Sequence, residues 1–196
     1  MNKKQTPSQT IGPYFAYGLT PEGYGKAGIV TNILVNDNTQ GERIRIHGQV
    51  VDGNDEPVKD ALLEIWQADN AGRYRHPEDK PEMNSDFAGF GRRGTDDNGM
   101  YSFVTIKPGR VQGSGLELQA PHINLIVFMR GILVHAYTRI YFSDEHESNQ
   151  SDRILAGIEA SRRHTLIAQR GDTRQLTRYS FDIHLQGDDE TVFFDL

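Results

Sequence analysis

The strongest constraint on the fold is a period-two alternation of apolar and polar side chains within short segments. From residue 43, one face carries Ile44, Ile46, Gly48 and Val50, and the other carries Arg43, Arg45, His47 and Gln49. Successive side chains of a strand point to opposite faces, so this pattern is typical of a half-buried strand. Further strands are predicted at 61–68, 100–106, 122–129, 132–142 and 178–187. Six or more short strands separated by Gly and Pro turns indicate an all-β protein with an antiparallel β-sandwich core.

Other parts of the chain lack this alternation. Residues 1–42 are rich in Gly, Pro, Asn and Thr, and we interpret them as an N-terminal arm that must dock on something to be ordered. Long Gly-containing loops follow the second and third predicted strands and are long enough to build a site. Residues 152–168 carry apolar side chains at roughly helical spacing, which predicts one short helix. We therefore expect an arm over 1–42 and one β-sandwich domain over 43–196.

Composition excludes several classes of function. The chain has 21 Lys and Arg against 27 Asp and Glu, a formal net charge of -6, and no basic cluster that could follow a phosphate backbone. Nucleic acid and anionic membrane are therefore poor partner candidates. No run approaches the roughly 20 apolar residues that span a bilayer, and we expect a cytoplasmic protein. The absence of cysteine leaves His, Tyr, Asp and Glu as possible metal ligands.

The segment "LQAPHINLIVFMRG" raises the question of a metal site. Side chains at i and i+2 of a strand share one face, so a His-x-His pair can converge on one metal ion. Here His122 is followed at this spacing by Asn124, whose neutral amide is a weak ligand for a transition metal. Tyr74 and His76 stand in the loop after a buried strand and could also bind metal. On spacing alone, His122 is equally compatible with a hydrogen-bonded structural histidine, and Tyr74 with a packing aromatic.

Two charged features remain open in the same way. Arg130 ends an apolar strand and shares a face with His122 by period-two counting, so it either pairs with a carboxylate of the protein or binds one of a ligand. Asp96 and Asp97 lie in "GRRGTDDNG", whose spacing does not match an EF-hand and favours a charged turn over a calcium loop.

Several stretches together resemble the intradiol ring-cleavage dioxygenases. They are "TPSQTIGPYF" (6–15), "GQVVDGNDEPVKDALLEIWQADNAGRY" (48–74), "TDDNGMYSFVTIKPG" (95–109), "APHINL" (120–125), "TRIYF" (138–142) and "YSFDIHLQGDDETVFFD" (179–195). They cover most of the chain in order. The combination of "LEIWQADNAGRY" with "IKPG" and "PHI" is far more specific than any one of these motifs.

The resemblance implies that two of the four iron ligands of the family are replaced in this sequence. The family binds one non-haem Fe(III) through two tyrosines and two histidines, and one of each falls on Tyr74 and His122. The second tyrosine falls on Val111 and the second histidine on Asn124, while the arginine expected shortly before the first histidine is replaced by Gln119. Valine cannot supply the anionic charge that stabilises a ferric ion. We infer that this chain holds no catalytic metal and that the Fe(III) is on a homologous beta chain.

The resemblance also implies a role beside that partner. It points to the non-iron-binding alpha chain of a higher-order alpha/beta assembly that cleaves protocatechuate (3,4-dihydroxybenzoate) with O2 to 3-carboxy-cis,cis-muconate. The arm would dock on the partner chain and line its substrate pocket with Gly12, Pro13 and Tyr14, and Arg130 would oppose the substrate carboxylate.

Two alternatives stand beside this hypothesis. One is a self-sufficient metalloenzyme that uses Tyr74, His122 and a further ligand such as His76. The other is a transthyretin-like β-sandwich used only for binding or assembly, because "GQVVDGNDEPVKDALLEI" and "TDDNGMYSF" recur in such modules. Activity that requires both chains would separate the main hypothesis from either alternative.

Overall fold

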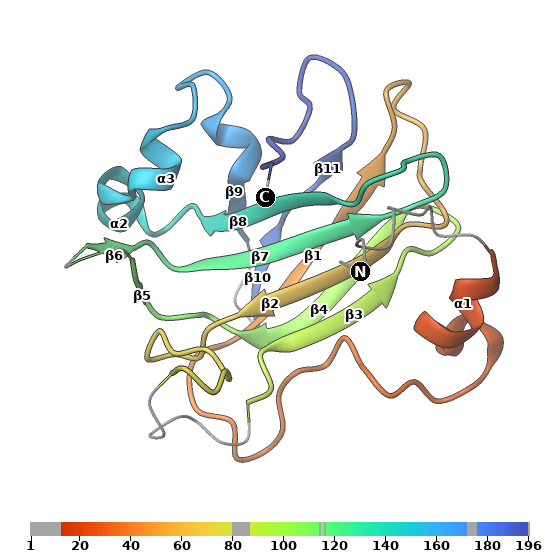
Figure 1. Ribbon diagram of the computed structural model, residues 1–196, viewed down its shortest axis with the longest axis horizontal. Coiled ribbons are helices and arrows are strands. Elements are labelled where there is room, and N and C mark those ends of the chain that lie inside the picture. The colour runs from red at the N-terminus through yellow and green to blue at the C-terminus, as the bar shows by residue number, and fades with distance from the viewer. Residues whose placement is uncertain (1–12, 80–86, 114, 116, 172–175, 196) are drawn as a thin grey trace, which may run out of the picture.

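The computed structural model describes residues 13–79, 87–113, 115, 117–171 and 176–195. Their fold is mostly β, with a few short helices at two ends of the molecule (Figure 1). The longer strands are β1 (Arg43–Val51), β2 (Leu62–Gln67), β3 (Phe90–Gly94), β4 (Met100–Ile106), β7 (His122–Phe128) and β8 (Ala136–Phe142). The shorter ones are β5 (Val111–Gln112), β6 (Leu118–Gln119), β9 (Ile167–Arg170), β10 (Thr177–Ser180) and β11 (Ile183–His184).

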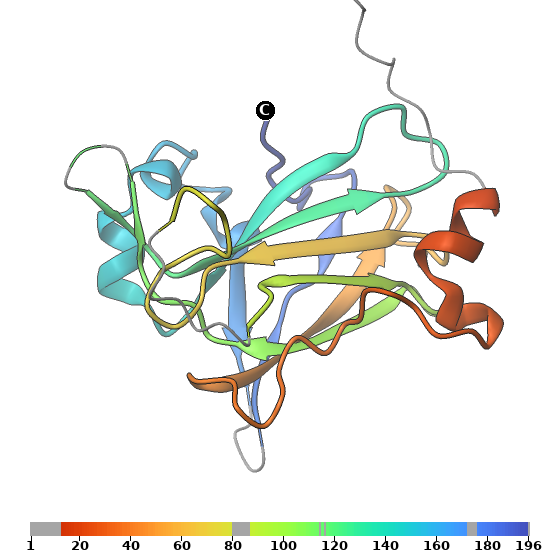
Figure 2. The ribbon, with the colours of Figure 1, turned by 60° about the horizontal axis from the view of Figure 1, so that its bottom comes forward.

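One large mixed sheet contains all of these strands except β5 and β6, which form a separate pair. Its order is β11-β1-β10-β9-β8-β7-β2-β3, and β4 pairs with β1 off this path. The sheet curls so that β2, β3, β7 and β8 lie over β1, β4 and β10, as both ribbon views show (Figures 1 and 2). Strand β9 pairs with β10 on one side and β8 on the other, which makes the sheet continuous and nearly closed, like a barrel.

The prediction of a mainly β protein is confirmed, and the antiparallel arrangement holds only in part. Strand β1 pairs in parallel with β10 and β11, and β8 pairs in parallel with β9. Parallel neighbours need a crossover rather than a hairpin. The helical segment between β8 and β9 supplies such a crossover, and the alternation of side chains within one strand cannot reveal it.

The hydrophobic core fills the space between the two facing parts of the sheet. Alternate residues of each strand point inward: Ile44 and Ile46 from β1, Ile123 and Leu125 from β7, and Ile140 from β8 are each no more than 1% exposed. A second, smaller cluster lies on the outer side under the helices and includes Tyr141, Leu155 and Leu166. The predicted period-two faces are therefore the faces that bury the core.

The expected single helix over 152–168 is wrong in extent and number. The structure has α2 (His146–Ser151), α3 (Arg153–Ala156) and the 3-10 turn η2 (Arg163–Leu166), and the segment then enters β9. The buried carboxylate of Asp152 caps α3 by accepting from the backbone N–H of Leu155 at 2.8 Å. Gly157 follows at once, so the apolar spacing marks buried side chains of separate short turns.

The described part of the N-terminal segment contains two short helical elements, α1 (Pro13–Leu19) and the 3-10 turn η1 (Pro21–Tyr24). Farther on, Leu34 is buried and its backbone N–H donates to the carbonyl of Val104 at 2.8 Å, so this segment packs along β4. No helix in the described ranges is long and apolar enough to cross a membrane.

Some strand boundaries also differ from the prediction. Strand β3 lies inside what we interpreted as a loop, because "FGRRG" shows no apolar alternation, and β8 begins at Ala136 rather than 132. The last predicted strand is split into β10 and β11, both of which pair with β1. Gly48 makes this possible: a Cβ there would lie 1.8 Å from the carbonyl oxygen of Phe181, so only glycine fits where β1 passes the segment between β10 and β11.

Candidate functional site

Strand register assembles a site on the outer face of the sheet near the start of β7. Trp66 on β2 is paired with Asn124 on β7, and Asn124 is paired with Arg139 on β8. Side chains directly opposite each other on neighbouring strands lie within contact distance. These three residues therefore form one row, although they are far apart in sequence.

Two loops cover this row and enclose a cavity. The loop after β2 brings Tyr74 over the sheet, and the β5–β6 pair brings Val111 and Gln119. The cavity has a volume of about 560 Å³. It is lined by Glu64, Ile65, Trp66, Tyr74, Phe90, Val111, Gln112, Gln119, His122, Asn124, Ile126, Tyr137 and Arg139. We call it the outer-face pocket.

The Tyr74 loop is held by hydrogen bonds from its backbone N–H groups to two of its own carboxylates. The carboxylate of Asp69 accepts from the N–H groups of Ala71 and Arg73 at 2.8 and 3.0 Å, and Asp79 accepts from the N–H of Tyr74 at 2.7 Å. Asp side chains that bind the backbone two to four residues on are typical of tight loops. The position of Tyr74 is thus fixed by carboxylates within "ADNAGRYRHPED" (68–79).

A directed chain of hydrogen bonds runs through the pocket. The Nδ1 of His122 lies 2.8 Å from the carbonyl oxygen of Ala120, which can only accept, so Nδ1 carries the proton and Nε2 is the acceptor. The hydroxyl of Tyr74 lies 3.4 Å from Nε2 and accepts from the amide of Asn124 at 3.0 Å. Tyr137 donates to the amide oxygen of Asn124 at 2.5 Å. Each polar atom of the chain therefore has a partner of the right kind.

Burial sets the protonation states of His122 and Tyr74 in this hydrogen-bond chain. Desolvation, followed by the positive charge of Arg139, lowers the pKa of His122 to about 4. Desolvation also raises the pKa of Tyr74, against the opposing effect of its hydrogen bond from Asn124. At neutral pH both side chains are uncharged: an imidazole and a phenol, rather than an imidazole and a tyrosinate.

These residues do not fit the Fe(III) that the resemblance implies for the family. Val111 offers no donor, and the amide nitrogen of Asn124 points its N–H at Tyr74. The lone pair of His122 Nε2 faces the Tyr74 hydroxyl, and the cationic Arg139 lines the same cavity. Within the ranges that the structure describes, no three His, Cys, Asp or Glu side chains come together as a metal site. His76 is exposed, does not line the pocket, and accepts from the N–H of Glu78 at 3.3 Å.

Arg139 is the residue of this pocket that sequence reasoning missed. Its Nη1 donates to the side-chain oxygen of Gln119 at 2.7 Å. Gln119 stands where the resemblance expects an arginine, so a guanidinium is present beside that position but comes from a different strand. The signal was the polar residue within the otherwise apolar "TRIYF" segment, and its meaning depends on the β7–β8 register.

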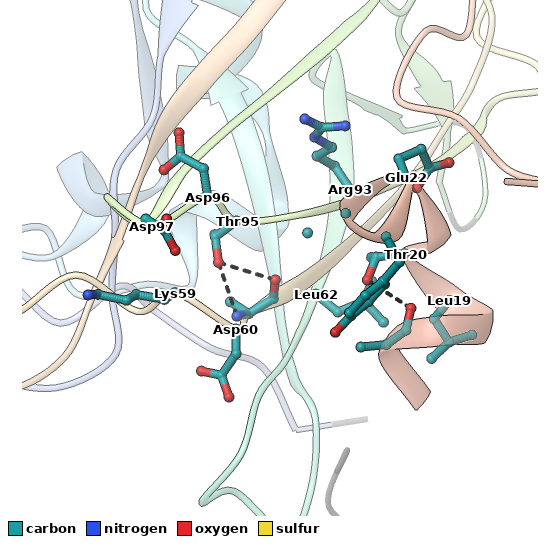
Figure 3. A pocket seen from close by; sticks show the side chains of 15 residues that line it. Leu19, Thr20, Glu22, Lys59, Asp60, Leu62, Arg93, Thr95, Asp96 and Asp97 are labelled. Atoms are coloured by element: carbon teal, nitrogen blue, oxygen red, sulfur yellow. Dashed lines mark hydrogen bonds between the residues drawn. The ribbon is translucent and has the colours of Figure 1, made fainter. Parts of the chain in front are cut away.

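A second region lies at the other end of β7. Arg130 is in the turn between β7 and β8, its side chain is 68% exposed, and its Nε forms an ion pair with Asp60. Asp60 lines a cavity of about 440 Å³ beneath α1, together with Ala16, Leu19 and Thr20 of the N-terminal segment. Figure 3 shows α1 on one side of this cavity and Lys59, Asp60, Asp96 and Asp97 on the other. We call this region the arm end.

The structure separates the residues that the resemblance assigned. The β7–β8 turn, which contains Arg130, and α1 lie at the same end of the sheet in both ribbon views, opposite α2 and α3 (Figures 1 and 2). Pro13 and Tyr14 begin α1, and Gly12 and the side chains of Pro13 and Tyr14 lie outside the described residues. Strand β7 ends at Phe128 and its seven residues span roughly 20 Å, so Arg130 lies in the turn beyond the strand and does not belong to the site of His122.

The Asp96 and Asp97 segment forms a turn. The Asp96 carboxylate accepts from the backbone N–H groups of Asn98 and Met100, both at 2.9 Å, and Gly99 has a positive φ of 70°. These contacts hold the entry to β4. Such contacts are typical of a charged turn, which is the interpretation that the sequence favoured over a calcium loop.

The comparisons with known proteins agree with this arrangement. Residues 11–187 match the family described as Dioxygenase. The chain therefore belongs to this dioxygenase family. It is 46% identical to the protocatechuate 3,4-dioxygenase alpha chain of Burkholderia cepacia, over 98% of both chains. It is 34% identical to the beta chain from the same organism, over 89% of this chain and 77% of that one.

A solved structure supports the fold. The intradiol ring-cleavage dioxygenase of Tetranychus urticae superposes with a TM-score of 0.60 at 21% identity, over 93% of this chain and 94% of that one. At this identity the likeness concerns the fold, and the donor set of the site must be read from the residues of this chain.

Proposed function

We propose that this chain is the alpha subunit of a heteromeric intradiol dioxygenase that cleaves protocatechuate with O2 to 3-carboxy-cis,cis-muconate. The observation that carries the proposal is the 46% identity to an alpha chain over nearly the whole length. The donor set of the outer-face pocket supports it, because a chain without a usable iron site needs a partner to perform this reaction. The Fe(III) belongs on a homologous beta chain, and the two chains are expected to work together in the cytoplasm in a higher-order alpha/beta assembly.

In this proposal the chain contributes to the substrate pocket of its partner. Residues 1–42 dock on the partner, Gly12 and Pro13 allow close backbone approach, and Tyr14 hydrogen-bonds or stacks on the ring. Arg130 binds the carboxylate of protocatechuate. Its exposure supports this role, because an exposed guanidinium paired with one carboxylate can exchange that partner for another at little cost. Residues 43–196 hold these groups in place as one β domain.

The decisive test is kinetic and uses the assembled complex. In Arg130→Ala the substrate carboxylate loses a charged hydrogen-bond donor, which costs about 2 kcal/mol or more, so kcat/KM for protocatechuate should fall roughly 30-fold or more. Arg178→Ala, which removes an exposed arginine on β10, is the matched control and should keep the wild-type value. An unchanged kcat/KM in Arg130→Ala would remove Arg130 from the substrate role.

Iron analysis tests the division of labour between the chains. The chain should be purified alone and after co-expression with a beta-type chain, and iron should be measured in both. We expect iron and visible tyrosinate-to-iron absorption only in the complex, at one iron per alpha/beta pair. Stoichiometric iron in the chain alone would favour the self-sufficient enzyme, and full assembly without ring cleavage would favour the transthyretin-like binding module.

A further inference from the structure

The outer-face pocket has the properties of a small-molecule site although its residues do not suit iron. Its volume of about 560 Å³ falls within the range of ligand pockets. It is open to solvent, since Trp66 in its wall is 42% exposed.

One wall of the pocket carries a positive charge that no described carboxylate neutralises. Arg139 donates to the neutral amide oxygen of Gln119 at 2.7 Å and lies beside the hydroxyls of Tyr137 and Tyr141. The buried carboxylate of Asp152 does not pair with it directly and accepts from the hydroxyl of Tyr141 at 3.3 Å. Among the described residues, none of the ion pairs involves Arg139. A half-buried guanidinium in this setting favours an anionic ligand with planar geometry.

The acid in the pocket does not cancel this charge. Glu64 lines the cavity, but its carboxylate accepts from Arg92 Nε at 2.7 Å and is neutralised by that pair. His122 is uncharged at neutral pH because burial lowers its pKa to about 4. Among the residues that line the cavity, the charge left after Glu64 pairs with Arg92 is the positive charge of Arg139.

Aromatic side chains form another part of the lining. The rings of Trp66 and Tyr74 pack with centroids 4.7 Å apart and an interplanar angle of 50°, and Phe90 and Tyr137 complete the lining. Val111 and Ile126 add apolar surface. Walls of this kind favour a flat ring, which gains from burial and from contact with the neighbouring aromatic rings.

We propose that the outer-face pocket is a second ligand site of this chain, which binds small aromatic carboxylates with the carboxylate on Arg139 and the ring against Trp66 and Tyr74. The proposal rests on the charge and shape of this pocket alone. It does not depend on the proposed role of Arg130, which lies at the other end of β7.

Trp66 provides the measurement, because it is the single tryptophan of the chain and forms part of the pocket wall. The full chain, without its partner, should be titrated with benzoate at neutral pH and followed by tryptophan fluorescence. Saturable quenching is expected, with one site confirmed by calorimetry. Benzamide, which has the same shape without the charge, should bind roughly tenfold more weakly, and acetate, which has the charge without the ring, should be weaker again.

Variants locate the site. Arg139→Gln should weaken benzoate binding roughly tenfold and bring benzoate and benzamide close to equal affinity, while the control Arg178→Gln should bind as the wild type does. If Arg139→Gln does not fold, the comparison of benzoate with benzamide on the wild-type chain still decides the matter. An absence of saturable binding, equal affinity for benzoate and benzamide, or equal affinity for benzoate and acetate would each overturn the proposal.

Discussion

The two ends of strand β7 are built on opposite principles. At its start, His122 is 1% exposed and belongs to a hydrogen-bond chain in which each donor has one acceptor. Past its end, Arg130 is 68% exposed and forms an ion pair with Asp60. The first arrangement fixes its side chains, and the second leaves a charged group ready to change partners.

This difference determines how each end accommodates its polar and charged side chains. A polar side chain that is buried must find hydrogen-bond partners. Asn124 solves this by bridging Tyr74 and Tyr137. At the arm end water solvates the charges, so Arg130 needs no such network. Its availability to a ligand therefore does not depend on the residues of the outer-face pocket.

The largest expected effect concerns the pH dependence contributed by the buried end. The folded-state pKa of His122, about 4, lies below its ordinary value of 6.5, so the unfolded chain binds its proton first as the pH falls. The stability that the neutral imidazole provides is present above pH 6.5 and is lost between 6.5 and 4. Between pH 7 and pH 4, the free energy of unfolding of the wild type should fall by about 3 kcal/mol more than that of His122→Gln.

Urea unfolding at a series of pH values measures this difference. His135→Gln is the control, because His135 is exposed on the β7–β8 turn at the other end of β7. Its unfolding free energy should follow the wild-type pH profile. Parallel profiles for His122→Gln and the wild type would mean that His122 is solvated, and the contrast between the two ends would fail.

The next effect concerns the hydrogen-bond chain itself. Asn124→Leu leaves the Tyr137 hydroxyl without its acceptor and the Tyr74 hydroxyl without its donor, which should lower the free energy of unfolding by about 2 kcal/mol. Tyr137→Phe removes one of these contacts by itself. If the residues form one network, the double variant should lose less stability than the sum of the two single variants, by at least about 0.5 kcal/mol. Strict additivity in urea unfolding would show independent contacts.

How far the fold could be predicted depended on whether the information lay within one segment. The faces of β1 were correct because burial of alternate side chains is a property of one strand. The parallel pairing of β1 with β10 was not predicted, because it depends on a distant segment. The helix over 152–168 was wrong for a related reason: the apolar residues there pack on Tyr141 from separate short turns.

The candidate site divides in the same way. Tyr74, Val111, His122 and Asn124 were found by motif, and the structure brings all four to one pocket. Arg139 was missed because its importance comes from register with Asn124 and contact with Gln119, neither of which is local in sequence. The roles of Gly12, Pro13, Tyr14 and Arg130 stay predictions, since they concern a partner chain and a substrate.

The smallest expected effect tests the arm end. Asp60 and Arg130 are 37% and 68% exposed, so water screens their attraction and the pair is worth less than about 1 kcal/mol. Asp60→Asn should therefore change the free energy of urea unfolding by less than about 1 kcal/mol, about half the effect of Asn124→Leu or less. A loss of about 2 kcal/mol would show that Asp60 is as tightly built in as the buried network. A weak pair is also what the proposed role of Arg130 requires, because a guanidinium that costs little to release can bind the carboxylate of a substrate without reducing the stability of the fold.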